Sequence, residues 1–240
     1  MRWWIADPDR WEREIHDMGA WFPDWQYDLG VHYHLTGEPF LIIVWEGELQ
    51  PLPDSEQEAV KILAHLKKDS EVIVGRGGTL LHPPACTDPD DDMPAQVRGR
   101  SDYGTRFALR TEQFAPPAHP KVYSDRPHLG PELYETQGHV NRDGSLCPYT
   151  ATDEDWNGRR DTLALYLRRG VSILLAKHLY WTWTGNWPGQ RGPHGEIEAD
   201  AEARQRPPNV QCWCGSGKPY RDCHKKKGQP RIFSFRRASS

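Results

Sequence analysis

A polar turn runs directly into a single cysteine in the segment His139-Val140-Asn141-Arg142-Asp143-Gly144-Ser145-Leu146-Cys147. Asn, Asp and Gly tolerate positive φ angles and hydrogen-bond to their own backbone, so residues 141–144 predict a tight reversal. Such a reversal would hold the thiol that follows in a fixed position. Because the cysteine thiolate is a strong nucleophile, we interpret Cys147 as a catalytic residue.

The segments on either side of this turn predict a sheet in front of it and a long helix behind it. Residues 106–110 alternate apolar and polar side chains as a strand does, and the prolines of residues 114–120 forbid a helix. Tyr123 is expected to begin the next strand. After the cysteine, Asp155 or Asn157 is a candidate helix cap. Apolar side chains then recur at three- and four-residue spacing, which predicts a long amphipathic helix: Leu163, Leu167, Val171, Leu174 and Leu175.

Two further stretches bear on the fold. Asp7-Pro8 is a helix start signal, with Asp7 at the N-cap and Pro8 at the first helical position, so a short amphipathic helix should follow. The aromatic residues 180–187 are expected to form a loop that packs against the long helix. The alternative is that this loop binds an extended peptide tail.

From about residue 103 to residue 179, this order of elements resembles the ubiquitin-conjugating enzyme (UBC) fold. The features that carry the resemblance are the proline-rich loop of residues 114–123, the His139/Asn141 turn, the Gly144-Ser145-Leu146-Cys147 run, Trp156 and the long helix. The resemblance implies an α+β fold: a UBC-like antiparallel meander sheet, an N-terminal helix and a long helix after the active-site cysteine. The family's usual His-Pro-Asn tripeptide lies further from the cysteine than His139-Val140-Asn141 does, and in this respect the chain is more similar to the conjugating enzymes of bacterial antiphage operons.

The resemblance implies acyl transfer through a thioester at Cys147. The chain would accept a ubiquitin-like protein, or the C-terminus of a cyclic-nucleotide synthase, from an activating enzyme and pass it to an amine, as in antiphage (CBASS-like) defence. His139 is the nearest candidate to assist proton transfer, and Asn141 is a candidate oxyanion donor. Other candidates for the base that assists the incoming amine are Asp153, Asp155 and His194. The spacing difference leaves the roles of these helpers open.

Composition indicates a protein of a reducing, cytoplasmic compartment. The 240 residues contain five cysteines, an odd number, and three of them cluster. The sequence contains neither an apolar run of eighteen residues nor a secretory leader. The formal net charge of −4 is divided unevenly, since residues 204–240 carry ten Lys/Arg against the single Asp222, a balance of +9 that leaves −13 for residues 1–203. A basic tail on an acidic body indicates a separate module.

That module contains four N/S donors with the spacing of a closed structural zinc site: Cys212, Cys214, Cys223 and His224. The Gly215-Ser216-Gly217 turn lets the two ligand pairs meet, and metal binding would supply the folding energy of so small a segment. The segment resembles the SEC-C motif of the SecA translocation ATPase. We therefore expect three parts: a UBC-like domain over residues 1–195, a linker over 196–209, and a zinc module with a basic tail over 210–240.

Several alternatives remain open from the sequence. The chain could be a non-catalytic UBC-like adaptor, or a cysteine hydrolase that uses Cys147 with His139 or His194. It could also be a zinc-dependent nucleic-acid binder, because Lys225, Lys226 and Lys227 lie beside the zinc ligands. Docking of a protein partner is the preferred role for the basic tail, and no membrane partner is expected.

Overall fold

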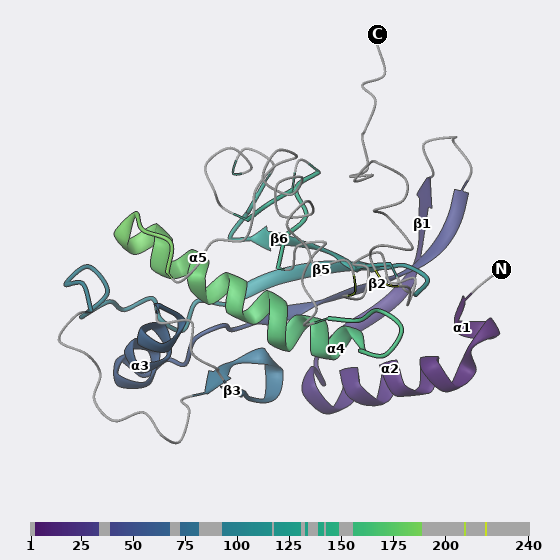
Figure 1. The fold of residues 1–240 in the computed structure, drawn as a ribbon, viewed down its shortest axis with the longest axis horizontal. Helices are drawn as coiled ribbons and strands as arrows, with labels where there is room; N and C mark the ends of the chain where they lie inside the picture. Colours follow the sequence, from purple (N-terminus) through teal and green to yellow (C-terminus); the bar gives the residue numbers. More distant parts are fainter. Residues whose placement is uncertain are drawn as a thin grey trace, which may run out of the picture.

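The structure is a computed structural model that describes residues 3–33, 39–67, 73–81, 93–116, 118–130, 133, 139–141, 143–148, 156–188, 209 and 219. Most of the helices and strands are labelled in Figure 1. In chain order they are α1 (Trp3–Ala6), α2 (Pro8–Trp21), β1 (Gln26–Tyr33), β2 (Pro39–Leu49), α3 (Glu56–Lys67), β3 (Ile73–Val74), η1 (Arg76–Gly78), β4 (Leu80–Leu81), β5 (Phe107–Gln113), β6 (Lys121–Arg126), α4 (Leu163–Tyr166), η3 (Leu167–Val171) and α5 (Ser172–Thr184).

Four strands form an antiparallel meander in the order β1-β2-β5-β6. The β1–β2 ladder runs without a break from Gln26 opposite Glu46 to Tyr33 opposite Pro39. A second, two-stranded sheet pairs β3 with β4 in the segment between β2 and β5. The fold is therefore α+β with the meander sheet that the sequence predicted.

Burial alternates along β5, the strand between β2 and β6. Alternation of this kind places every second side chain on the face of the sheet that packs against the core. The buried positions of β5 are Phe107, Leu109, Thr111 and Gln113. Gln113 accepts a hydrogen bond of 3.0 Å from the indole Nε1 atom of Trp45 on β2, which satisfies a polar group inside this layer.

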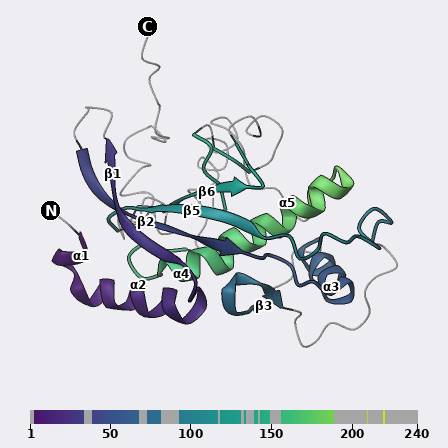
Figure 2. The same ribbon diagram turned by 180° about the vertical axis from the view of Figure 1, so that it is seen from behind.

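A continuous helical segment formed by α4, η3 and α5 crosses one face of the sheet. Figure 1 shows it in front of the strands and Figure 2, the view from behind, shows it beyond them. The apolar positions predicted from the helical spacing are buried in this layer: Leu163, Leu167, Val171, Leu174 and Leu175. One turn of the segment, η3, is a π-helix rather than an α-helix.

The start of α2 is the N-cap that the sequence predicted. Asp7 accepts a hydrogen bond of 3.1 Å from the N–H of Arg10 through its Oδ1 atom, and Pro8 occupies the first turn. Both features satisfy helix-end requirements within a few residues of the chain.

The start of the long helix is a correction to the sequence analysis. It begins at Leu163, not near Asn157, because Asn157 instead caps a preceding turn by accepting a hydrogen bond of 2.9 Å from the N–H of Arg159. The N–H of Leu163 donates to the Oε2 atom of Glu14 on α2, at 2.7 Å. The helix therefore begins where another helix supplies an acceptor for its first free N–H group. Asp155 lies outside the described residues.

Glu14 is held in place by a buried ion pair. Its Oε1 atom lies 2.7 Å from Nη2 of Arg10, and both side chains are almost fully enclosed. Burial raises the pKa of Glu14, while the hydrogen bond from Leu163 and the charge of Arg10 oppose that rise. Arg10 also donates to the backbone oxygens of Arg159 and Asp161. This arrangement joins α2 to the loop before α4, since a buried charge is tolerated when it is paired.

The end of the long helix also differs from the prediction. Residues 180–184 continue α5 rather than forming a loop, and the helix stops at Gly185, which adopts a left-handed conformation with φ 73°. Tyr180 and Trp183 are buried in the core, but as residues of the helix itself rather than of a loop that packs against it. Among the described helices, none has the length and apolar character that a membrane crossing requires.

Candidate active site

A short β-hairpin presents Cys147. Val140 and Leu146 pair as an antiparallel bridge, and the N–H of Cys147 donates to the backbone oxygen of His139 at 2.7 Å. At the tip, the N–H of Asn141 donates to the oxygen of Ser145 at 2.7 Å. The polar turn predicted from the sequence is therefore the tip of a hairpin whose second strand leads into the thiol.

The hairpin is attached to the edge of the main sheet. The N–H of Leu146 donates to the backbone oxygen of Val122 on β6 at 2.6 Å. Val140 and Leu146 are both buried, with 3% exposure each, so one face of the hairpin belongs to the core. Burial of these two side chains fixes the register of the hairpin because a shift of one residue would expose them.

Two residues of the hairpin adopt positive φ angles. Gly144 has φ 83°, a conformation that glycine adopts without steric cost. His139 has φ 52° and is the one non-glycine residue with a positive φ angle in the described part of the chain. A non-glycine residue in this region costs about 1–3 kcal/mol and tends to occur at functional sites.

A chain of polar side chains braces the hairpin tip. The Nζ atom of Lys121 on β6 lies 2.6 Å from Oδ2 of Asp143, and the hydroxyl of Ser145 donates to Oδ1 of Asp143 at 2.6 Å. The Nδ2 atom of Asn141 donates to the same hydroxyl at 3.1 Å. Burial acts to raise the pKa of Asp143, but the hydrogen bonds from Lys121 and Ser145 outweigh it and hold the pKa below the ordinary value of 3.8. The carboxylate therefore stays charged and keeps the tip rigid.

Cys147 follows this braced tip and is half-buried. The backbone that leads into the thiol is held by two hydrogen bonds. Its N–H is bonded to His139 and the preceding residue, Leu146, is bonded to β6. The structure thus holds the candidate nucleophile by backbone contacts rather than on a loose loop.

The imidazole of His139 stacks on the indole of Trp187, with ring centroids 4.1 Å apart and an angle of 15° between the planes. Trp187 follows the end of α5 and is buried, with 8% exposure. The contact brings a residue from the far end of the helical layer beside the Cys147 hairpin. It also fixes the plane of the imidazole next to the backbone of the cysteine.

A second aromatic contact joins the chain before β6 to the chain after Cys147. The ring centroids of His119 and Trp156 are 4.7 Å apart, and Trp156 also packs edge-on against Tyr166 of α4 at 5.2 Å. Desolvation of the ring by these neighbours lowers the pKa of His119, although the residue as a whole is exposed to solvent.

The structure brings together three of the residues predicted for catalysis: Cys147, His139 and Asn141. The remaining predicted catalytic residues lie outside the described residues: Asp153, Asp155 and His194. The sequence analysis assigned no role to Lys121, Ser145 or Trp187. Lys121 and Trp187 reach their partners across the fold, and no local pattern signals such contacts. The contact of Ser145 with Asp143 spans only two residues and belongs to the turn chemistry that the sequence already indicated.

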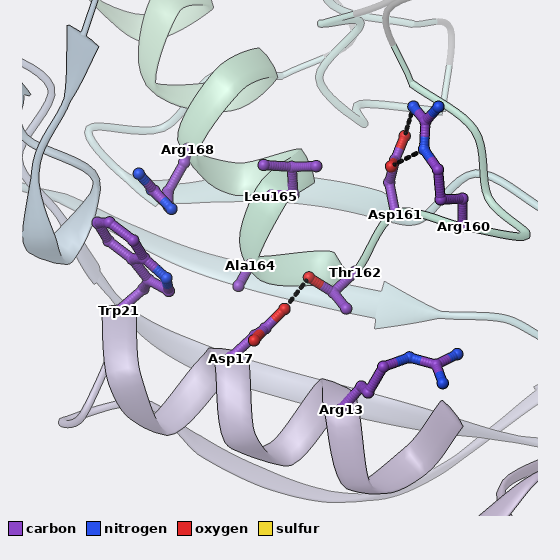
Figure 3. Close-up of a pocket in the computed structure, with 9 residues that line it drawn as sticks. All are labelled: Arg13, Asp17, Trp21, Arg160, Asp161, Thr162, Ala164, Leu165 and Arg168. Carbon is purple, nitrogen blue, oxygen red and sulfur yellow. Dashed lines mark hydrogen bonds and ion pairs between the residues drawn. The ribbon is translucent and has the colours of Figure 1, made fainter. Parts of the chain in front are cut away.

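A separate cleft of about 180 Å³ lies between α2 and the start of the long helix (Figure 3). Its charged residues are Arg13, Asp17, Arg160, Asp161 and Arg168. Most of them are engaged within the fold: Asp17 accepts a hydrogen bond of 2.8 Å from the hydroxyl of Thr162, Arg160 pairs with Asp161 at 2.6 Å, and the guanidinium of Arg168 lies over the ring of Trp21. Burial, together with the charge of Arg169, lowers the pKa of Arg168 to about 10.

We interpret this cleft as the seam between two packed elements. No residue of the Cys147 hairpin lines it. The cleft and the candidate active site are therefore formed by different residues.

Comparison with known proteins identifies one segment. A family model for the SEC-C motif matches residues 209–226, the range that contains all four predicted zinc ligands. No curated protein and no solved structure matches the chain. Cys212, Cys214, Cys223 and His224 lie outside the described residues, and among the residues that are described no three His, Cys, Asp or Glu side chains are grouped to hold a metal.

Proposed function

We propose that the protein is a ubiquitin-conjugating-type acyl carrier that forms a thioester at Cys147. The observation that carries the proposal is the placement of this cysteine. It follows a hairpin attached to β6 of a four-stranded antiparallel meander, and a long helix that packs on the sheet follows it. Conjugating enzymes present their nucleophile in the same order of elements. The N-terminal helix α2 is also where that fold has its first helix.

The reaction consists of two acyl transfers. In the first, the thiolate of Cys147 attacks the thioester that an activating enzyme has formed with a protein C-terminus. A new S–C bond forms at Cys147, the S–C bond to the activating enzyme breaks, and the sulfur of the activating enzyme leaves as a thiolate. In the second, an amine attacks the Cys147 thioester, an N–C bond replaces the S–C bond, and the amine's proton passes to a base.

The hairpin contains groups suited to assist these steps. The imidazole of His139 can accept a proton, and its plane is fixed by Trp187. Asn141 can donate from its amide to an oxyanion, an effect worth about 3 kcal/mol per donor in well-studied enzymes. The brace of Asp143 and Ser145 limits the motion of Asn141, since its amide is bonded to the Ser145 hydroxyl. Asp153, Asp155 and His194 remain candidates for activating the incoming amine.

The transferred group would be a ubiquitin-like protein or the C-terminus of a cyclic-nucleotide synthase, supplied by a separate activating enzyme. Because the sequence resembles the bacterial conjugating enzymes, we propose that the reaction serves antiphage defence in the cytoplasm. These assignments rest on the sequence motifs around Cys147.

The test is intact-mass analysis of the full chain purified from its host under acidic, non-reducing conditions. The wild-type chain should carry a protein-sized adduct that a thiol reductant removes. Cys147→Ser should carry an adduct that resists the reductant, because an oxyester forms in place of a thioester. Cys147→Ala should carry none and is the matched control, since its side chain is small and cannot be acylated.

The alternatives are distinguished by the same adduct measurement and by one further assay. Absence of an adduct on both wild type and Cys147→Ser, with the activating enzyme present, would end the enzyme proposal and leave the adaptor. Release of a free acid from a model thioester without any added amine would indicate a cysteine hydrolase. Both outcomes can be read from the same preparation.

We also propose that residues 209–226 bind one structural zinc ion through Cys212, Cys214, Cys223 and His224. The family match to the SEC-C motif supports this proposal, as does a donor set of three thiolates and one imidazole. Metal analysis should find about one zinc per chain, and Cys212→Ser should reduce it. Cys86→Ser is the matched control, because Cys86 is not among the proposed ligands. The resemblance to the SEC-C motif is our reason to propose a protein partner for this module, whereas its basic residues are also compatible with nucleic acid. Retention on DNA that falls steeply with salt would reverse the preference.

A further inference from the structure

Strand β1 forms an open edge of the main sheet. Among the described strands its ladder partner is β2 alone. Four of its side chains present apolar or aromatic surface to solvent, at exposed fractions of 53%, 51%, 54% and 64%: Tyr27, Leu29, Val31 and Tyr33. An exposed apolar edge strand is a template for pairing with another strand.

The free backbone groups of this edge face outward at the same positions. The N–H of Leu29 donates to the Oδ1 atom of its neighbour Asp28 at 2.7 Å, so this amide is directed away from β2. A side chain that covers its own edge amide is a local substitute for a ladder partner. A second strand that paired here would replace that bond with a backbone hydrogen bond.

The sequence of the strand is self-complementary about its central glycine. In Tyr27-Asp28-Leu29-Gly30-Val31-His32-Tyr33, each residue on one side of Gly30 has a counterpart of matching chemistry on the other. Antiparallel pairing about Gly30 would place Leu29 opposite Val31 and Asp28 opposite His32. Opposite residues in a ladder point to the same face, so the aliphatic side chains would meet on one face and acid would meet base on the other.

We propose that β1 is a homodimer interface, in which the β1 strands of two copies pair antiparallel about a two-fold axis at Gly30 and join their sheets into one. We assign the partner strand to a second copy of the chain because the β1 sequence is complementary to itself. A two-fold interface brings each residue i opposite j and each j opposite i. An unrelated strand would have to match the aromatic, charged and aliphatic positions independently. The terminal aromatic residues, Tyr27 and Tyr33, would pair at both ends of the ladder.

The outward direction of the Leu29 amide also sets which pairs carry the hydrogen bonds. Leu29 and Val31 of the two copies would form hydrogen-bonded pairs, and Asp28 and His32 would form the closer, non-hydrogen-bonded pairs. His32 is oriented within its own chain by Glu112, whose Oε2 atom lies 3.3 Å from its Nδ1 atom. The carboxylate of Asp28 from the second copy would therefore approach a His32 ring that Glu112 of β5 already orients.

The first experiment measures the mass of the full chain by sedimentation velocity from about 1 µM to about 500 µM, a range that covers weak homodimers. The wild-type chain should shift from monomer to dimer as the concentration rises. Val31→Lys should raise the dimer dissociation constant at least tenfold, because a charge would enter the apolar face twice. Ile5→Lys is the matched control, since Ile5 is also an exposed β-branched residue, at 64% against 54% for Val31, but lies on α1.

The second experiment tests the register by disulfide trapping with a copper–phenanthroline oxidant. An equimolar mixture of Asp28→Cys and His32→Cys chains should cross-link, because directly opposite residues in non-hydrogen-bonded pairs meet the distance requirement of a disulfide. Each variant alone should cross-link no more than wild type, since like positions would be about 13 Å apart along the strands. These single-variant samples also account for the native thiols.

Three results would overturn the proposal. The first is a monomeric mass at every concentration. The second is a dimer that Val31→Lys leaves unchanged, which would place the interface elsewhere. The third is trapping in a single-variant sample to at least the extent seen in the mixture, which would indicate another register. None of these results depends on the chemistry of Cys147.

Discussion

The two outer strands of the main sheet, β6 and β1, solve the same physical problem in different ways. An outer strand has a row of backbone groups without a ladder partner, and proteins either cover such an edge or leave it for another chain. At β6 the Cys147 hairpin covers part of the edge through the hydrogen bond from Leu146 to Val122. At β1 the described residues leave apolar side chains exposed to solvent. The amide of Leu29 at this edge is bonded to the side chain of the preceding residue, Asp28. The edge at β6, which the hairpin covers, thus carries the candidate nucleophile Cys147. The edge at β1 is the one that we propose pairs with a second copy of the chain.

The largest expected difference between the two edges is in the stability lost when a leucine is replaced by alanine. Leu146→Ala should lower the free energy of unfolding by about 2–5 kcal/mol, because Leu146 is 3% exposed and anchors the hairpin in the core. Leu29→Ala should change it by no more than about 0.5 kcal/mol in the monomer, because Leu29 is 51% exposed. Denaturant unfolding at a concentration below the dimer dissociation constant measures both. Equal effects would contradict the distinction between a covered and an open edge.

The next effect concerns the backbone of the covered edge. Gly144 has φ 83°, and an L-residue in this conformation is strained by about 1–2 kcal/mol. Gly144→Ala should therefore reduce the midpoint of denaturant unfolding and should also reduce the yield of the Cys147 adduct. Gly144→Asn is the control, because Asn tolerates positive φ better than Ala does. If both substitutions had the same effect, the conformation of the tip would not be the cause.

The smallest effect is the electrostatic brace of the hairpin. Hydrogen bonds from Lys121 and Ser145 hold the pKa of Asp143 below its ordinary value of 3.8, so its charged form stabilises the fold above that pH. Asp143→Asn should cost about 0.5–1 kcal/mol near neutral pH, a value reduced for the 36% exposure of this side chain. The difference from wild type should vanish as the pH falls below 3.8 through the lowered pKa of the folded state.

A double-mutant cycle with Lys121→Met supplies the control for this prediction. The cost of Asp143→Asn should be smaller in the Lys121→Met background, because the two side chains are in direct contact at 2.6 Å. An unchanged cost would assign the stabilisation to Ser145 alone.

Part of the fold was predictable because the responsible interactions are local. The N-cap of α2 depends on Asp7 and an amide three residues later, and both are visible in the sequence. The alternation of β5 and the three- and four-residue spacing of α4 to α5 likewise lie within single segments. The tight turn at residues 141–144 follows from residue types that favour positive φ or bond to their own backbone.

The boundaries of the long helix were not predictable from these local patterns. Its first N–H group is satisfied by Glu14, which lies 149 positions away in the chain. Asn157 has the chemistry of a cap, yet it caps a different turn because Glu14 and Arg10 hold the following loop elsewhere. The sequence contains both possible caps and no local means of choosing between them.

What the sequence indicated by itself is the N-terminal helix, the alternating strand before the proline-rich loop, the tight turn and the body of the long helix. It also indicated a candidate nucleophile and four candidate metal donors, because periodicity, turn chemistry and ligand spacing are properties of short segments. Only the tertiary structure decided that Trp187 stacks on His139, that Lys121 braces Asp143, and that β1 is left at an open edge of the described sheet. The physical reason is that each of these features depends on which distant segments meet when the apolar faces are buried. That choice is made by the packing of the whole core, not by any one stretch of the chain.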